Sequence, residues 1–182
     1  GLKVAVRNAQ DGVSVVQTAE GALTESHAIL QRMRDLAVQA ANDGAQSTEA
    51  KAAAQTEFTQ LSSELDDIAK TQFGGVNLLD GQFSKSFQVG ANNGDSLSVA
   101  IDNGSGGGLD STGLGVNGLD LTTGAAAAID TINTAVTTVS TTRANLGAVQ
   151  NRLEHKINNL NVAVENLSAS ESRIRDTDMA SE

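Results

Sequence analysis

The chain has 182 residues, no cysteine, no proline, no tryptophan and no tyrosine, and its formal net charge is −10. Without cysteine it has no disulfide and no thiolate metal site, and its acidity argues against a nucleic-acid or anionic-membrane partner. No apolar run approaches the roughly 20 residues needed to cross a bilayer, so we expect no membrane insertion. The aliphatic composition without proline favours long helices over a thick globule.

The first expected element is a long helix over residues 1–43. Its apolar residues recur at the spacing of one helical face, at Leu2, Val6, Ala9, Val13, Val16, Leu23, Leu30 and Ala37. Gly12 and Gly21 lie inside this helix, where each costs about 1 kcal/mol relative to alanine. We attribute both glycines to close helix packing.

A second helix is expected over residues 47–70. Ser47 or Thr48 can cap it, and Glu49 suits its first turn. Its apolar face consists of Ala54, Phe58, Leu61, Leu65 and Ile68.

Residues 72–102 read as turns followed by a β-hairpin. Phe87 and Val89 alternate with polar neighbours, as do Leu97, Val99 and Ile101, and Asn92-Asn93-Gly94-Asp95 lies between the two runs. The glycine-rich stretch that follows, residues 103–124, is expected to be a flexible loop.

The last third of the chain carries an unbroken heptad over residues 125–175, capped by Thr122 or Thr123. Alternating steps of three and four from Ile129 meet a mostly aliphatic seam, which runs through Ile132, Val136, Val139, Arg143, Leu146, Gln150, Leu153, Ile157, Leu160, Val164, Leu167, Glu171 and Ile174. Such a seam needs another helix to cover it.

These elements predict a mainly α single domain. Its two long helices and one shorter helix form an elongated antiparallel bundle, with the hairpin docked on its side or end. The arrangement brings both chain termini close together at one end of a rod. A rod of this kind indicates a structural or assembly protein.

Little in the sequence indicates catalysis, metal binding or cofactor binding. His27 and His155 have no second ligand nearby, and no nucleophile elbow or phosphate loop is present. We expect no enzyme, no catalytic or metal-binding residue and no cofactor. The cluster of Arg32, Arg34 and Asp35 beside Met33 and Leu36 is open to two interpretations, a surface salt-bridge lattice or an interface.

Five stretches resemble bacterial flagellin. Gln31–Gln39 (QRMRDLAVQ) is similar to its QRxRELAVQ motif, and residues 71–81 (TQFGGVNLLDG) are similar to TQFNGxxLLDG. Residues 87–92 match FQVGAN, residues 146–153 match LGAVQNRL, and residues 172–182 resemble SRIxDxDxAxE. The matches run in family order across nearly the whole chain.

The resemblance implies a structural subunit of the bacterial flagellar filament that self-assembles with other flagellin subunits. It implies an extracellular location, export through the flagellar secretion apparatus and an export chaperone. Residues 103–124 stand where the family inserts its variable outer domain. The chain also resembles the family's core without its terminal inner-tube segments, so we expect these residues alone to be monomeric or weakly associated.

Some flagellins are ligands of Toll-like receptor 5, so the resemblance makes recognition by this receptor a hypothesis for this chain. The family's contact residues correspond to Arg32, Leu36 and Glu57, and Gln31 and Met33 belong to the same motif. The same helix face packs against neighbouring subunits in filaments of the family.

Two alternatives remain open from the residues. A hook–filament junction protein has similar terminal helices but generally matches the internal motifs less closely. A surface binding module built on a coiled coil would account for the heptad, but not for five motifs in order.

Overall fold

The computed structural model describes residues 1–181, with side chains described as far as residue 174. The elements follow in the order α1 (Leu2–Ala40), α2 (Thr48–Ile68), β1 (Gln72–Phe73), β2 (Val76–Asn77), β3 (Phe83–Gln88), β4 (Ser96–Ile101) and α3 (Leu121–Ser181). The predicted fold class, a helical bundle with a docked β-hairpin, is confirmed.

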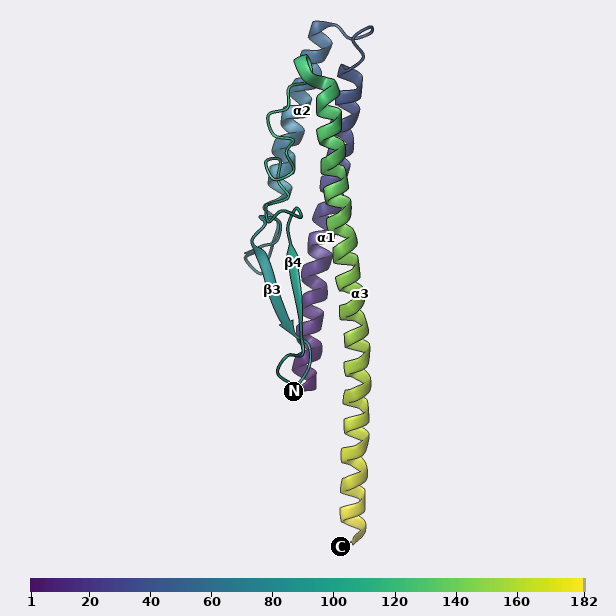
Figure 1. Cartoon of the computed structure of the whole chain (residues 1–182). Coiled ribbons are helices and arrows are strands. Elements are labelled where there is room, and N and C mark those ends of the chain that lie inside the picture. The colour runs from purple at the N-terminus through teal and green to yellow at the C-terminus, as the bar shows by residue number, and fades with distance from the viewer. Residues whose placement is uncertain (182) are drawn as a thin grey trace.

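The molecule is an elongated rod in which the partners of α3 change along its length (Figure 1). At one end α1, α2 and α3 pack together. Further along, the hairpin β3–β4 takes the place of α2 beside α1, and beyond the start of α1 only α3 continues. The pairing of α1 with α3 is antiparallel, since Arg34 Nε donates to Asn133 Oδ1 at 2.8 Å and Gly12 lies against Leu153.

Apolar side chains on the facing sides of the helices form the core. The largest fully buried ones include Leu23, Leu30, Met33, Phe58, Leu65, Ile132 and Leu146. Leu153 is 0% exposed and Leu160 is 5% exposed, so the predicted seam of α3 is sealed that far.

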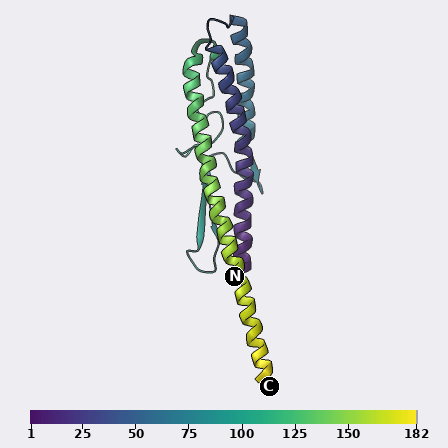
Figure 2. The same cartoon turned by 90° about the vertical axis from the view of Figure 1, so that its right-hand side faces the viewer.

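The chain termini lie toward the same end of the rod but are not adjacent. α3 runs well past the start of α1, as two perpendicular views show (Figures 1 and 2). The prediction of neighbouring termini is therefore wrong in its detail. The reason is length: α3 has 61 residues and α1 has 39.

The caps of α2 and α3 come from different residue types. Ser47 caps α2, its hydroxyl accepting from the backbone N–H of Ala50 at 3.0 Å. The cap of α3 is Asp120 and not the predicted Thr122 or Thr123. The carboxylate of Asp120 accepts from the backbone N–H of Thr122 at 2.9 Å. Gly124 then interrupts the helix with non-helical backbone angles, so the regular part of α3 begins near the predicted residue 125.

The hairpin β3–β4 has Phe87 opposite Leu97 and Phe83 opposite Ile101. Leu97, Val99 and Ile101 turn inward and their neighbours outward, as the alternation predicted. A smaller antiparallel pair, β1–β2, was not predicted as strands. Its four residues are all exposed and give no period-two signal.

The stretch after β4 is not a loose loop. Leu109 and Val116 are fully buried, and Asn103 holds three backbone groups: its Oδ1 accepts from Ser105 and Gly107, and its Nδ2 donates to the carbonyl of Gly113. The α2 residue Asp66 accepts from the N–H of Ser111 at 2.8 Å. Side-chain contacts to the backbone therefore order a segment whose glycines predicted flexibility.

The two glycines of α1 have different surroundings. A Cβ at Gly12 would come within 3.1 Å of Leu153 Cδ1, which agrees with close packing. Gly21 is exposed, and a Cβ there would have no other heavy atom within 4 Å, so close packing does not explain it.

Candidate interaction surfaces

An ion pair joins α1 to α2 at the surface. The guanidinium of Arg32 meets the carboxylate of Glu57 through two hydrogen bonds, Nε to Oε1 at 2.8 Å and a terminal nitrogen to Oε2 at 2.9 Å. The two side chains are 50% and 41% exposed. A bidentate pair fixes the planar head of Arg32 while leaving much of it open to a partner.

The pair shifts both ionisation equilibria. The hydrogen bond to Arg32 lowers the pKa of Glu57, and the same bond, followed by the charge of Glu57, raises the pKa of Arg32. Both groups therefore keep their charges over a wider pH range than they would alone.

The other predicted contact residues divide into exposed and buried ones. Gln31 is exposed, and its Nε2 lies 3.4 Å from His27 Nε2. Met33 is 0% exposed and Leu36 is 2% exposed. In this conformation both side chains belong to the core, so neither is exposed for contact with a partner. That the predicted contact residues form an interface remains a prediction, and it now rests on Gln31, Arg32 and Glu57.

A second surface lies on α3 beyond the start of α1, where the heptad continues without cover. Leu167 and Ile174 are 63% and 62% exposed, and Val162 is 55% exposed. Val162 lies off the heptad, whereas Leu167 and Ile174 are one heptad apart on the same face of α3; we call Leu167 and Ile174 the distal stripe. The periodicity predicted Leu167 and Ile174 as seam positions, but it did not tell where the covering helix ends.

The described residues give little support for a metal site or a membrane-spanning helix. No group of three or more histidine, cysteine, aspartate or glutamate side chains is placed to hold a metal ion there. None of the helices in this part of the chain is long and apolar enough to cross a membrane.

Comparison with known proteins identifies the family. Residues 1–84 match the sequence family described as "Bacterial flagellin N-terminal helical region". Residues 129–182 match the family described as "Bacterial flagellin C-terminal helical region". A flagellin of Bacillus subtilis (strain 168) is 45% identical over 218 aligned residues, covering 100% of this chain and 70% of the relative. The chain belongs to the bacterial flagellin family.

Other relatives agree. A flagellin of Halalkalibacterium halodurans is 47% identical, with 100% of this chain and 67% of the relative aligned. The crystal structure of Bacillus cereus flagellin superposes with a TM-score of 0.73 at 33% identity, covering 91% of this chain and 94% of that one. These relatives are named flagellins, as the five motifs predicted, and not junction proteins.

The family fixes the broad function. As a flagellin, the protein is a structural subunit of the flagellar filament and not an enzyme. Its partners accordingly include other flagellin subunits. The surfaces to explain are therefore those that hold protein partners rather than substrates.

Proposed function

We propose that this flagellin joins copies of itself through helix packing, and that the distal stripe packs against another helix in the assembled filament. The supporting observation is the change in burial along one heptad. Leu153 is 0% exposed, whereas Leu167, two heptads on, is 63% exposed. An apolar stripe left in water on an otherwise regular helix indicates a place where another helix packs.

The test uses polymerisation of the purified full-length flagellin, because residues 1–182 alone are expected to be monomeric or weakly associated. Leu167→Asp places a charge in the stripe without touching the folded bundle, so we expect the critical concentration to rise about tenfold or more while the melting temperature stays unchanged. Asn166→Asp is the matched control: it introduces the same side chain at the adjacent exposed position, off the heptad. Equal polymerisation of the two variants would remove the stripe from the assembly contact.

A second function, recognition by Toll-like receptor 5, is supported by the Arg32–Glu57 pair. The pair presents an oriented, half-exposed guanidinium on α1. Arginine is among the residues most enriched in the energetically dominant part of interfaces.

For this function, binding of the protein to the receptor ectodomain is the measurement. Arg32→Ala is expected to weaken binding about tenfold, whereas Arg7→Ala, an exposed arginine nearer the start of α1, is expected to leave it unchanged. Leu36→Ala is a poor probe, because it opens a cavity in the core. Equal affinity of the Arg32 variant and the wild type would exclude Arg32 from the site.

The proposal includes location and export: the filament lies outside the cell, and a flagellar export chaperone holds the subunit before secretion. Family membership supports both points. Shearing intact cells should release the protein into the medium as filaments, and affinity purification from cytoplasm should recover it with a chaperone. Protein found only in the cytoplasm would contradict the location.

A further inference from the structure

The acidic charge of the chain is unevenly placed. Residues 35–130 hold 13 aspartates and glutamates against three lysines, Lys51, Lys70 and Lys85, so this segment alone accounts for the net charge of −10. The next part of α3 is the reverse: between Asp130 and Glu165 it carries Arg143, Arg152 and Lys156 against one carboxylate, Glu154.

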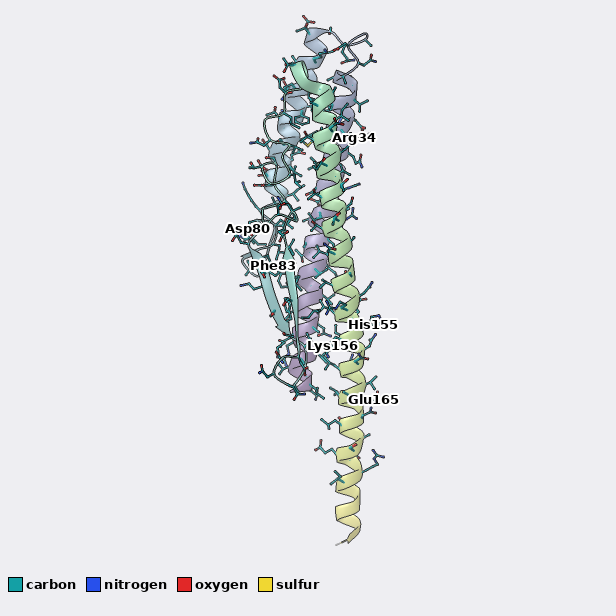
Figure 3. The ribbon with its side chains drawn as sticks, in the orientation of Figure 1. Arg34, Asp80, Phe83, His155, Lys156 and Glu165 are labelled. Carbon is teal, nitrogen blue, oxygen red and sulfur yellow. The ribbon has the colours of Figure 1, made fainter. Side chains whose placement is uncertain are left out.

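The basic residues of α3 line a cleft. Arg152, His155 and Lys156 face a hollow of about 400 Å³ between α3 and the tip of the hairpin, which supplies Leu97 and Asp95. Figure 3 places His155 and Lys156 on α3 at the level of this tip. We call this hollow the basic cleft.

The lining of the basic cleft holds two cationic side chains, Arg152 and Lys156, against one carboxylate, Asp95. Among the described residues no carboxylate forms an ion pair with Arg152, His155 or Lys156. Asp95 is held in the hairpin turn, where its Oδ2 accepts from the backbone N–H of Asn92 at 3.1 Å, and it offsets only part of the positive charge of the cleft. The nearby Glu154 accepts from Gln150 at 3.2 Å.

The matching surface lies on α2. At 100° per residue, Glu49, Glu64 and Asp67 fall on one side of this helix, and all three are exposed. Glu64 and Asp67 are three residues apart, and Arg152 and Lys156 are four apart, so each pair spans about one turn of its helix. We call Glu49, Glu64 and Asp67 the acidic face.

From this complementarity we propose that the basic cleft of one copy receives the acidic face of α2 from a second copy. The inference rests on the proposed self-assembly and names one of its contacts. Asp67 has one ion pair of its own, with Lys70 at 3.4 Å, but both side chains are about three-quarters exposed (75% and 77%). Such an exposed pair is weak and readily exchanged for a partner's arginine.

The geometry favours an open assembly. The basic cleft lies beside the hairpin tip and the acidic face lies on α2, so the two occupy different stretches of the rod (Figure 1). One copy therefore offers each neighbour a different surface, and a contact of that kind extends into a filament unless its rotation closes a ring. The charges set the rate and register of docking and make it sensitive to salt.

Charge reversal tests the pairing in the purified full-length flagellin. Arg152→Glu with Lys156→Glu places like charges opposite each other, so we expect the critical concentration to rise about tenfold or more at low salt. Lys3→Glu with Arg7→Glu is the control, since it reverses two exposed charges at the same spacing on α1. Adding Glu64→Lys and Asp67→Lys to the cleft variant should restore polymerisation. Failure of this swap to restore it, with every variant helical by circular dichroism, overturns the proposal.

Cross-linking separates this inference from the filament proposal. The chain has no cysteine, so one copy carrying Gln60→Cys, within the acidic face, and another carrying Asn159→Cys, at the cleft, have one thiol each. A short bis-maleimide should join unlike copies in preference to like ones. Filaments that form without this product would overturn the cleft pairing alone. The product without filaments would support the pairing and count against the filament proposal.

Discussion

α3 carries one heptad from end to end, but its two halves have different surroundings. As far as Leu160, α1, α2 and the hairpin cover the seam; past it, Leu167 and Ile174 are more than 60% exposed. The same sequence period thus yields a core in one half and an open surface in the other. Periodicity reports that a helix has a face to bury, but it does not report whether the burying partner belongs to the same folded unit.

The largest effect is expected from a comparison of heptad seam positions in the two halves of α3. Ile132→Ala opens a cavity among fully buried neighbours and is expected to lower the free energy of unfolding by about 2–5 kcal/mol. Leu167→Ala removes exposed side-chain atoms and should change the stability of the isolated chain by no more than about 0.5 kcal/mol. Urea denaturation measures both. Similar losses would mean that the distal half is covered in solution.

A second comparison sets a turn glycine that is packed against a neighbouring segment beside one that is open to solvent. Gly81 and Gly94 both have positive φ, at 83° and 91°. Alanine at either position costs about 1–2 kcal/mol from its backbone conformation. At Gly81 a Cβ would also lie 2.5 Å from the backbone of Gly107, whereas at Gly94 it meets nothing within 4 Å.

Gly81→Ala should therefore be the more destabilising of the two by at least about 1 kcal/mol. Thermal unfolding of the pair decides the point. Equal melting temperatures would show that the segment after β4 gives way easily, contrary to its network of hydrogen bonds.

The third comparison uses the two glycines of α1. Gly21→Ala is expected to stabilise the chain by about 0.5–1 kcal/mol, because the site is open and alanine is the better helix former. At Gly12 the new methyl presses on Leu153, so that gain is offset by an overlap costing about 1–3 kcal/mol. If Gly12→Ala stabilises the chain as much as Gly21→Ala does, Leu153 moves aside freely.

The smallest effect concerns the exposed Arg32–Glu57 pair. The folded-state pKa of Glu57 is lowered by its hydrogen bond to Arg32. Its stabilising contribution is therefore present above the ordinary glutamate pKa and is lost as the pH falls through the lowered value. Carboxyl NMR titration should show the pKa of Glu57 rising toward its ordinary value in Arg32→Ala. An unchanged pKa would mean that the pair does not persist in solution.

Local pattern predicted much of this fold from the residues alone. The apolar spacing, the Ser47 cap and the alternation of Leu97, Val99 and Ile101 depend on neighbours in sequence. Features that depend on distant residues were missed. Asp66 orders Ser111 from 45 residues away, and the burial of Leu36 depends on which face of α1 the other helices cover.

The interaction surfaces were less accessible to prediction. The family resemblance singled out Arg32, which lies in a matched motif, and Glu57, which does not, and the structure joins them in an ion pair. The basic cleft was not foreseen, because it forms only where the hairpin tip meets α3. Its sequence signal was present, however, in the run of basic residues between Asp130 and Glu165.

A repeating seam can slide by seven residues and still match apolar to apolar, so the alignment of two long helices needs features that do not repeat. Gln55 provides one, because its Oε1 accepts from the N–H of Leu121 and its Nε2 donates to the carbonyl of Leu119. The bond from Arg34 to Asn133 provides another. Both hold α3 in one register relative to α1 and α2, because a shift of the helix by one heptad would break all three hydrogen bonds.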